Sequence, residues 1–482
     1  MRIPEKSPDM ASVTDSGPIR VSADAIRLAG ELNGRYLHWD DLRYRDLGAF
    51  SMDEVWRLMK IARITSCRKA SIPGLDMSYC LLDYYTIDAL RRIDSRMSAG
   101  IVPGDLGRMS AMLAVSSVME ESIASSQIEG ASTTAAIAKR MLRTNAEPRD
   151  RSERMILNNY RAMQLIKGCL DEPLSPELIM EIHRTMTDGL MEDPGTSGRF
   201  REDDSIAIRD VYEDITYHVP APHDRIAGMV DGLCAYANDD SDGTHPLIKA
   251  MVIHYALAHI HPFLDGNGRV SRSLFYWFCL RNGYSMMEYL SVSRMIREHR
   301  RGYDMAFLLS ETDGEDITYF IRFNLKMIEG AMDAFDAYLR RKAEERTESM
   351  LIVDDRVLSQ RQSQMIGDMM RSGAPMSQYE LSMMYQTPVP TIRRDIVKLM
   401  EMGLVRIAGK DGHKMLYEYC GRRREPARAP TPLQKYIMHQ QRASRAPSSG
   451  PSRGCSPPCP GRRPSTRRRI RCCRSAPRHR WL

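Results

Sequence analysis

The spacing of apolar residues along the chain predicts a mainly helical protein. From about residue 22 to 345, apolar positions recur mostly at intervals of three and four, which is the period of a helix with one buried face. The run 178–186 is an example, and it follows a helix-start signal, Ser-Pro-Glu, at 175–177. The segment 315–347 contains no proline and becomes densely charged toward its end. We expect it to be a connecting helix.

One segment departs from the helical period. Ile206 and Ile208 alternate with small or polar residues, and the chain then runs through Tyr217, His218 and Val219 into a proline-containing stretch. Alternation of this kind indicates strands that are buried on one side only. We therefore expect a short β-hairpin near residues 204–219.

Three short amphipathic helices and a hairpin are predicted within residues 355–420. The first helix covers 359–372, a capping box of Ser377 and Glu380 begins the second, and Pro390 begins the third. Two strand-like runs then flank a polar turn that contains glycine. This order of elements resembles a small winged helix-turn-helix domain.

The third of these helices carries basic residues on one face. A recognition helix uses such residues to contact the phosphates of DNA in the major groove. An ordinary solvated helix face can have the same composition, so both interpretations stay open. The residues are Arg393, Arg394 and Lys398.

Length and charge divide the chain into several parts. Single domains usually hold roughly 100 to 200 residues, so 482 residues predict more than one folded unit. Residues 421–482 contain 17 Lys and Arg but one acidic residue, whereas residues 1–420 contain 52 basic and 61 acidic residues. An acidic body argues against a protein built mainly to wrap nucleic acid.

The basic tail, residues 421–482, and the polar residues 1–21 are expected to be disordered. The tail contains ten of the 26 prolines and has no helical period, so it cannot bury a core. It could bind nucleic acid or an acidic partner. Its mixture of Arg, Pro, Ser and Cys also resembles out-of-frame translation of GC-rich DNA, and both interpretations stay open.

Cysteine usage and hydropathy predict a cytoplasmic protein without a membrane partner. Six cysteines are scattered through residues 1–420, without the paired spacing of a zinc site or a disulfide framework. No stretch approaches the roughly 20 apolar residues that span a bilayer. The amino terminus also lacks an apolar signal core.

The segment His261–Arg272, HPFLDGNGRVSR, concentrates the candidate chemistry of the chain. A helix over 250–260 is expected to end before Pro262, because the residue that precedes a proline disfavours the helical conformation. Gly266 and Gly268 let an anion approach the unpaired N–H groups at the start of the next helix. The sequence therefore predicts a phosphate site in this loop.

The side chains around the loop suit a nucleotide. Arg269 and Arg272 lie three positions apart on one helix face, so both can reach the same polyphosphate. Asp265 supplies a carboxylate for Mg²⁺, which takes only one or two protein carboxylates when it accompanies a nucleotide. His261 can accept the proton of an attacking hydroxyl near neutral pH. Each feature alone is weak, since a lone histidine is more often a core residue, but together they predict a catalytic site.

This string matches, at every defined position, the signature of the Fic family: His, any, Phe, any, Asp or Glu, Gly, Asn, Gly, Arg, any, any, Arg. The resemblance extends over about residues 100–310, because the apolar helix before the motif and the run GRFR at 198–201 also look like the family. It implies a Fic-type helical bundle with a short β-hairpin flap. The catalytic domain would span 105–314 and follow an amino-terminal helical region over 22–104.

What the resemblance implies is a protein adenylyltransferase, which uses Mg²⁺ and transfers AMP from ATP to a Ser, Thr or Tyr hydroxyl of a target protein. His261 would be the general base, and Asn267 and the loop amides would hold the α-phosphate. Tyr303 would lie on the adenine side, and Gly268 marks the adenylylating type because the phosphorylating variant has Lys there. The hairpin near 204–219 would dock the target as an added strand.

The resemblance also implies a built-in inhibitor. Ser125, Glu129 and Gly130 match the Fic inhibitory pattern and end a helix that we predict over 105–130. By this likeness Glu129 would pair with Arg272 and keep the γ-phosphate of ATP out of its productive position. The isolated enzyme would then be weakly active.

Two alternatives stay open. In some relatives the inhibitory Glu orients a water that removes AMP from the target, so the same site would run in reverse. A different class of function is a transcriptional regulator that binds DNA through residues 355–420 and uses the Fic body as a nucleotide sensor without catalysis. A second copy of the chain is a further candidate partner.

Overall fold

The computed structural model is mainly helical, as the apolar spacing predicted. The strands in its described part form small two- and three-stranded sheets. The disorder predicted for residues 421–482 concerns a segment outside the described residues. The described ranges are 1–9, 22–80, 83–98, 107–210, 214–352, 358–372, 374–411 and 414–420, with only the course of the backbone considered for 107–112 and 343–352.

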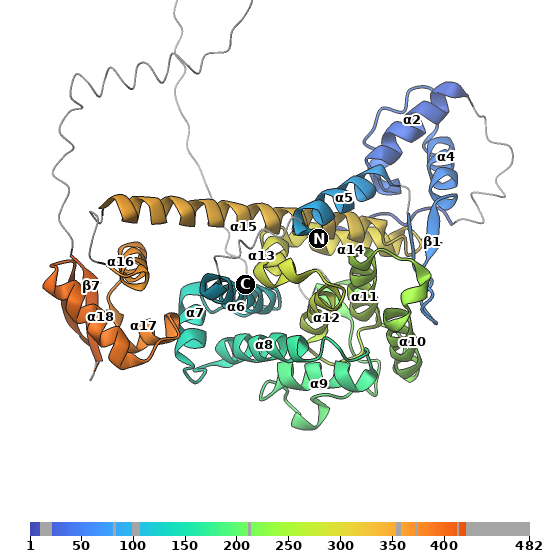
Figure 1. Ribbon diagram of the computed structural model, residues 1–482. Helices are drawn as coiled ribbons and strands as arrows, with labels where there is room; N and C mark the ends of the chain where they lie inside the picture. Colours follow the sequence, from blue (N-terminus) through green and yellow to red (C-terminus); the bar gives the residue numbers. More distant parts are fainter. Residues whose placement is uncertain are drawn as a thin grey trace, which may run out of the picture. The chain divides into compact units, whose positions relative to one another are not determined.

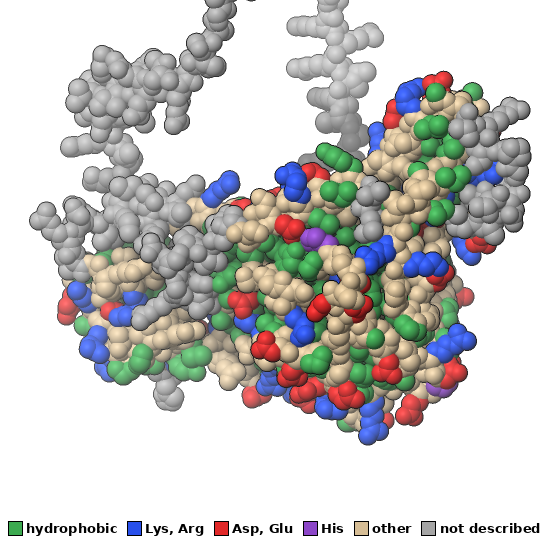
Figure 2. Space-filling view, turned by 45° about the vertical axis from the view of Figure 1, so that its right-hand side comes forward, with side chains coloured by type: hydrophobic (Ala, Val, Ile, Leu, Met, Phe, Trp, Pro, Cys, Tyr) green, Lys and Arg blue, Asp and Glu red, His purple; other side chains and the backbone are tan. Residues whose placement is uncertain are grey.

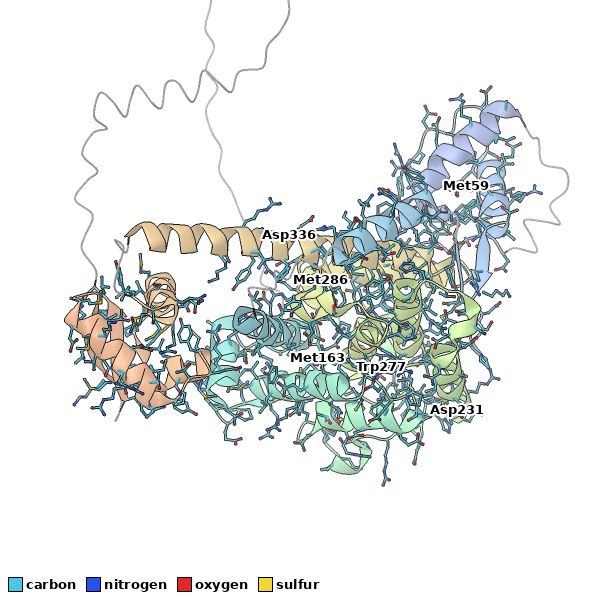
Figure 3. All side chains as sticks on the ribbon, in the orientation of Figure 1. Met59, Met163, Asp231, Trp277, Met286 and Asp336 are labelled. Atoms are coloured by element: carbon cyan, nitrogen blue, oxygen red, sulfur yellow. The ribbon has the colours of Figure 1, made fainter. Side chains whose placement is uncertain are left out.

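The helical body is assembled around two central helices, α11 (Pro246–Ile260) and α12 (Asn267–Arg281) (Figure 1). They pack against each other and are buried along almost their whole length. A helix that is apolar on all sides belongs in a core. In Figure 3, Trp277 of α12 lies inside this body, and its side chain is fully buried. The helices packed around the pair include α6 (Gly107–Ile128), α8 (Arg151–Gly168), α9 (Pro176–Thr187), α10 (Ile226–Asn238) and α15 (Thr318–Ile352).

Shorter helices complete the body. α13 packs against α6 and α15, and α14 packs against α15, so both lie close to the end of the helix predicted to be inhibitory. The short helices are α3 (Trp39–Leu42), α7 (Ala135–Thr144), α13 (Val292–Glu298) and α14 (Arg300–Thr312), with single 3-10 turns η2 (Pro194–Thr196), η3 (His223–Arg225), η4 (Asp240–Asp242) and η5 (Ser285–Tyr289).

The amino-terminal region is attached to the body through buried charges. Lys60 Nζ lies 2.9 Å from Asp313 Oδ1, and Arg63 Nη1 lies 3.4 Å from Asp313 Oδ2. Buried charges persist only when they are paired, so these contacts fix α4 against the end of α14. Residues 1–9 depart from the predicted disorder, because Ser7 Oγ donates to Asp313 Oδ1 (2.7 Å). The elements of this region are α2 (Ala23–Gly34), α4 (Met52–Ile64), β1 (Cys67–Lys69), β2 (Ser78–Cys80) and α5 (Tyr84–Ser98).

The predicted hairpin is present as two short antiparallel strands, β3 (Ile208–Asp210) and β4 (Ile215–His218). Ile208 is the register partner of His218, and the register shifts between Ile208 and Arg209. The side chains of Ile208 and Val219 are exposed. The pair forms a sheet of its own, so each strand has a second edge that no strand in the described residues occupies.

Residues 358–420 follow the predicted order of helices and hairpin, around an apolar core of their own. Ser377 and Glu380 form the predicted capping box, in which Glu380 N donates to Ser377 Oγ (3.2 Å) and Ser377 N donates to Glu380 Oε2 (2.8 Å). The short strand β5 was not predicted, and it joins the hairpin in a sheet of order β5-β7-β6. The elements are α16 (Gln360–Ser372), β5 (Met376–Ser377), α17 (Gln378–Met384), α18 (Val389–Glu401), β6 (Val405–Asp411) and β7 (Lys414–Tyr419).

Two further features concern the charged surface and the apolar content of the helices among the described residues. On the face drawn in Figure 2, acidic and basic side chains are interspersed. Among the described helices, none combines the length and the apolar character needed to pass through a bilayer.

Candidate functional site

His261 lies at the end of α11 in a left-handed backbone conformation, with φ 53° and ψ 59°. Few residues other than glycine adopt this conformation, and here it turns the chain sharply into the loop before α12. The ring Nδ1 lies 3.1 Å from Ala258 O, so it carries the proton and leaves the lone pair on Nε2. Burial lowers the pKa of His261 below its ordinary value. The ring is therefore neutral near pH 7 and presents an acceptor nitrogen.

Arg201 holds this turn from the segment that precedes the hairpin. Its side chain is buried, and Nε donates to His261 O (3.0 Å) while its backbone N–H donates to Pro262 O (2.9 Å). Nη1 donates to Asp204 Oδ1 (2.9 Å). Arg201 thus ties the hairpin segment to the position of His261. Sequence patterns showed the run 198–201 only as a family likeness, since no local period reveals a partner sixty residues away.

His183 of α9 packs against the loop between α11 and α12 and holds its shape. Its ring stacks on Phe263, with centroids 3.8 Å apart and planes inclined by 2°. Gly198 N donates to Nδ1 (2.9 Å), so Nε2 carries the proton and donates to Asp265 O (2.9 Å). Burial lowers the pKa of His183 to about 4, which keeps it neutral. This residue was not singled out from the sequence, where it looks like any core position of an amphipathic helix.

Asn267 closes the loop on itself. Its Oδ1 accepts from Phe263 N (2.9 Å), and its Nδ2 donates to Phe263 O (2.7 Å). The family resemblance assigned Asn267 to the α-phosphate; here Oδ1 and one of the two N–H groups of Nδ2 bond to the loop backbone, which leaves the second N–H. Gly266 precedes it with φ 85°, a conformation that glycine adopts without strain. Asn267 and Gly266 therefore shape the loop at the start of α12.

Arg269 is fully buried, and its hydrogen bonds are incomplete. Nη1 donates to Met186 O (3.0 Å), whereas Nε and Nη2 have no hydrogen-bond partner among the described residues. Burial lowers the pKa of this guanidinium. Leaving buried charged donors unpaired is costly, and an anion in front of the loop would satisfy them. The site therefore fits a phosphate group.

Asp265 presents a carboxylate beside this position. Its side chain is 46% exposed, and Oδ2 lies 3.6 Å from Arg269 Nη2 and 3.8 Å from Arg151 Nη2. Oδ1 accepts from Gly266 N (2.6 Å). An accessible carboxylate next to a phosphate position is what a nucleotide-bound Mg²⁺ requires of a protein. The residue present fits the predicted metal role.

Arg272, one turn further along α12, has its donors occupied by α6. Nε donates to Ser125 Oγ (2.9 Å), and Nη2 donates to Ser125 O (3.0 Å) and to Glu129 Oε1 (2.8 Å). Burial alone would raise the pKa of Glu129, but the charge of Arg272 holds it below its ordinary value. The structure thus brings Ser125 and Glu129, the two residues assigned to the inhibitor, into contact with Arg272.

Gly268 leaves room for the Glu129 carboxylate. A Cβ atom at this position would lie 2.3 Å from Glu129 Oε1 and 3.1 Å from Arg272 Nη1. The contact between Glu129 and Arg272 therefore needs a residue without a side chain at 268.

The end of α6 is fixed by basic residues from the neighbouring helices. Arg300 Nη1 donates to Ile128 O, and Arg297 Nη1 donates to Gln127 Oε1. A cation at the carboxyl end of a helix also interacts favourably with the helix dipole. These contacts hold Glu129 in place, although an acid at this end of a helix is unfavourable by itself.

Tyr303, which the resemblance placed on the adenine side, lies in the core. Its hydroxyl lies 2.9 Å from His254 Nε2, and its ring packs edge-on against Phe307. The residue is 5% exposed. The structure places it among aromatic side chains, and it also interacts with Arg272, whose charge opposes the rise in the pKa of Tyr303 that burial causes.

The three basic residues of α18 are not brought to this loop. Their side chains are exposed on one face of the helix, while Ile392, Ile396 and Leu399 on the other face are buried. The basic residues are Arg393, Arg394 and Lys398.

Comparison with known proteins agrees with the geometry. Residues 173–279, which contain the loop, α11 and all but the last two residues of α12, match the sequence profile of the Fic/DOC family. The chain contains a Fic domain. The Fic region thus includes α9 and the hairpin as well as the phosphate loop.

Curated relatives carry the same domain. The protein adenylyltransferases Fic of Drosophila grimshawi and Drosophila virilis are each 31% identical to the chain over 214 residues, which is 43% of the chain. That segment covers 41% and 40% of the two relatives, so the chain spans about two fifths of the length of these proteins.

Solved Fic structures were also matched. A Fic family protein from Desulfovibrio desulfuricans is 18% identical, with a TM-score of 0.48 and coverage of 71% of this chain and 98% of the other. Fic-1 from C. elegans is 20% identical, with a TM-score of 0.46 and coverage of 66% and 84%.

Proposed function

We propose that the Fic domain is a protein adenylyltransferase that transfers AMP from ATP to a hydroxyl of a target protein. The observation that carries this proposal is Arg269, whose buried Nε and Nη2 have no hydrogen-bond partner among the described residues and lie in the first turn of α12, just after the loop that begins at His261. A nucleotide phosphate supplies the missing acceptors. The naming of the Drosophila relatives as adenylyltransferases supports the same reaction.

The reaction needs a general base and groups that stabilise the negative charge of the phosphates. The target hydroxyl oxygen forms a bond to the α-phosphorus of ATP, the bond from that phosphorus to the bridging oxygen breaks, and pyrophosphate leaves. His261 Nε2 takes the hydroxyl proton. Phosphoryl chemistry of this kind is mainly positioning and electrostatic stabilisation. The loop amides after Gly266 and the guanidinium of Arg269 therefore provide most of the positioning and charge stabilisation.

Asp265 would hold Mg²⁺, which supplies charge neutralisation on the phosphates when it is bound. The role of Asn267 is then indirect, since it keeps the loop amides in position through its bonds to Phe263. The target would add a strand to an open edge of the hairpin β3–β4. Its backbone would be aligned there, and Arg201 links that alignment to the turn at His261.

Glu129 restrains this activity in the proposed scheme. It occupies Arg272, the second arginine of the motif, which would otherwise contact the distal phosphates of ATP. ATP bound beside an engaged Arg272 would have its γ-phosphate displaced. The α-phosphate would then be misaligned for attack.

The experiment compares the full chain with Glu129→Gly and with the double variant Glu129→Gly/His261→Ala, using ATP labelled at the α-phosphate. Glu129→Gly should increase the label on the chain itself or on a target, and the double variant should carry none. Equal labelling of all three proteins would refute the scheme. ATP labelled at the γ-phosphate is the control, since its label on protein would show phosphorylation instead.

The reverse reaction is tested on the same material. A target modified by Glu129→Gly is purified and incubated with the wild-type chain. Release of AMP by the wild-type chain, but not by Glu129→Gly, would assign removal to this site with Glu129 as the residue that orients water.

A second candidate function is DNA binding by residues 358–420. The observation in its favour is the exposed basic face of α18, formed by Arg393, Arg394 and Lys398. Binding to duplex DNA should weaken steeply as salt increases, and the triple alanine variant should lose it. Binding that is unchanged by the triple variant would remove this candidate.

A further inference from the structure

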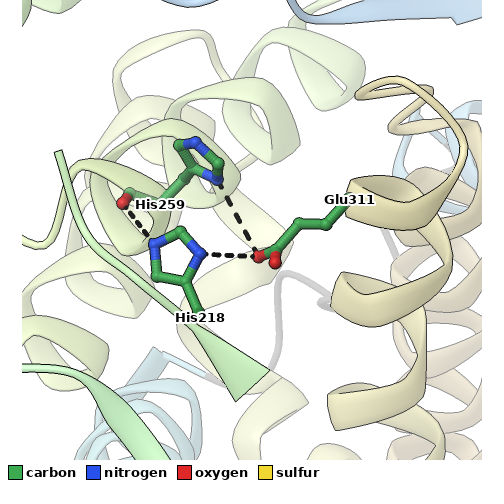
Figure 4. Close-up of side chains that lie close together, drawn as sticks. All are labelled: His218, His259 and Glu311. Carbon is green, nitrogen blue, oxygen red and sulfur yellow. Dashed lines mark hydrogen bonds and ion pairs between the residues drawn. The ribbon is translucent and has the colours of Figure 1, made fainter. Parts of the chain in front are cut away.

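Three side chains from separate elements converge beside the hairpin. His218 ends β4, His259 lies near the end of α11, and Glu311 lies on α14 (Figure 4). His218 Nδ1 lies 3.1 Å from Glu311 Oε1, and His259 Nδ1 lies 3.9 Å from the same oxygen. One potential ligand atom from each residue falls within 4.8 Å of the other two. Two imidazoles and a carboxylate therefore point at a common position.

The hydrogen bonds around His218 determine which nitrogen faces the carboxylate with a lone pair. Nε2 lies 2.8 Å from His259 O, a carbonyl that can only accept, so Nε2 carries the proton. In the neutral ring, Nδ1 then presents its lone pair to Glu311. Two acceptors face each other at this distance only when a proton or a metal cation lies between them. A histidine that donates its second N–H to a backbone carbonyl is the usual arrangement at metal sites.

His259 supplies the second, independent observation. Its Nδ1 is buried and lies 3.9 Å from both Glu311 Oε1 and Glu315 Oε2, so it has two carboxylates nearby but no hydrogen bond to any residue that the structure describes. Buried polar atoms are normally satisfied, so such an atom calls for an explanation. It points toward the position between His218 and Glu311. A ligand bond to a cation would satisfy it.

We propose that His218, His259 and Glu311 form a binding site for a divalent transition metal, with Zn²⁺ as the cation that the donor set fits best. Zinc binds imidazole nitrogen and carboxylate oxygen at about 2.0 to 2.2 Å, so neighbouring ligand atoms in a tetrahedral site lie about 3.3 Å apart. The two measured separations, 3.1 and 3.9 Å, lie on either side of that value. Small side-chain rotations are enough to close the site.

Glu315 is positioned as a fourth ligand. Its Oε2 lies 3.9 Å from His259 Nδ1 and accepts a hydrogen bond from Tyr255 OH (2.9 Å). Outer hydrogen bonds of this kind orient carboxylate ligands in metal sites. A water molecule is the alternative occupant of the fourth position. Either one completes a tetrahedron.

The metal would connect the hairpin to the helix that carries the base. His218 belongs to the strand proposed to dock the target, and His259 lies two residues before His261. A bound cation therefore fixes β4 to α11 and α14 more firmly than one hydrogen bond does. This site differs from the Asp265 position, because two imidazoles favour Zn²⁺ over Mg²⁺. It requires no AMP transfer, so it stands or falls independently of the proposed function.

The experiment titrates Zn²⁺ into the metal-free full chain and measures the bound metal by elemental analysis. The comparison proteins are His218→Ala, His259→Ala and Glu311→Gln, the last of which preserves the shape of the side chain. His223→Ala is the matched control, since His223 is an exposed histidine paired with Asp204. Cysteines elsewhere in the chain also bind Zn²⁺, so the decisive quantity is the difference between proteins.

The wild-type chain and His223→Ala should each bind one more equivalent of Zn²⁺ than the three site variants. Loss of a direct ligand should weaken binding by more than the about 10- to 100-fold that loss of an outer partner costs. Co²⁺ should give the visible absorption of a tetrahedral site in the wild-type chain and in His223→Ala only. Equal Zn²⁺ stoichiometry and affinity in all five proteins would overturn the proposal. The cluster would then be an ion pair between protonated His218 and Glu311.

Discussion

The two ends of the candidate phosphate site differ in how far their hydrogen bonds are completed. At the loop end, Arg269 is buried, and two of its nitrogens make no hydrogen bond to the described residues, although Nη2 lies 3.6 Å from Asp265 Oδ2. At the α6 end, Arg272 is equally buried, but three hydrogen bonds to Ser125 and Glu129 occupy it. The two arginines lie three residues apart on one helix and are chemically identical. Their neighbours alone decide which one is available.

This difference indicates how a site can be formed and restrained at the same time. The loop end is ready to accept a phosphate, because its shape is held by bonds that do not involve a ligand, such as those of Asn267. At the α6 end, the carboxylate of Glu129 contacts Arg272, and in the proposed scheme it takes the place of a phosphate oxygen. We therefore expect ATP to bind without being aligned. The restraint would change the alignment of the ATP α-phosphate more than the affinity for ATP.

The largest effect is expected at the loop end. In the Glu129→Gly background, Arg269→Ala should lower kcat/KM for ATP by about 100- to 1000-fold, which is the typical loss when one preorganised donor to a developing charge is removed. Steady-state AMP transfer measures it. Arg161→Ala is the matched control, because Arg161 is an exposed arginine of α8. A loss below tenfold, or an equal loss in the control, would contradict the role of Arg269.

The next effect is the release of Arg272. Glu129→Gly should raise AMP transfer by about 10- to 100-fold, the value of a hydrogen bond between charged groups. Glu129→Gln keeps the shape and one hydrogen-bond acceptor but removes the charge. It should give a rate between those of the wild-type chain and Glu129→Gly. A rate for Glu129→Gln equal to that of the wild type would show that the restraint is steric.

A smaller effect is expected from the hydroxyl of Ser125. Its Oγ accepts from Arg272 Nε, and the loss of one such bond changes an equilibrium by about fivefold. Ser125→Ala should therefore raise AMP transfer by about two- to fivefold, since the bonds to Ser125 O and Glu129 remain. Ser116→Ala, on the same helix, should leave the rate unchanged. If both variants behave alike, Ser125 has no part in the restraint.

The smallest effect is expected from pH. Arg272 holds the pKa of Glu129 below its ordinary value, so the ionised contact is present above that ordinary value and is lost only when the pH falls through the lowered one. The ratio of the rates of Glu129→Gly and the wild-type chain should therefore stay constant from about pH 6 to pH 8. A ratio that falls toward pH 6 would show that the contact titrates in that range.

The sequence was sufficient for features that depend on local spacing. The capping box at Ser377 and Glu380 and the start of α9 at Ser175 follow from residues a few positions apart, and both are present. The turn at Pro262 was visible for the same reason. The likeness to a known motif supplied the partnership of Glu129 with Arg272, which no spacing would reveal.

Features that depend on distant parts of the chain could not be predicted. Arg201 bonds to His261 O, and His183 stacks on Phe263, although each partner lies some sixty to eighty residues away. His218 and Glu311 are further apart still, and neither looks unusual in its own helix or strand. The partners of His259 are also distant along the chain, since Glu311 lies on another helix. Such contacts arise only when the helices are packed.

In the proposed scheme, Arg272 serves both the restrained and the active state of the site, which has a consequence for how the restraint can be lost by mutation. Changes in α6 at Ser125 or Glu129 would free Arg272 and leave the catalytic helix whole, whereas changes at Arg272 would remove the restraint and the activity together. A selection for overactive alleles should therefore return substitutions in α6 and none at position 272. Most substitutions in the catalytic helix α12 would abolish activity. Few positions in the chain would therefore activate the protein when they are mutated.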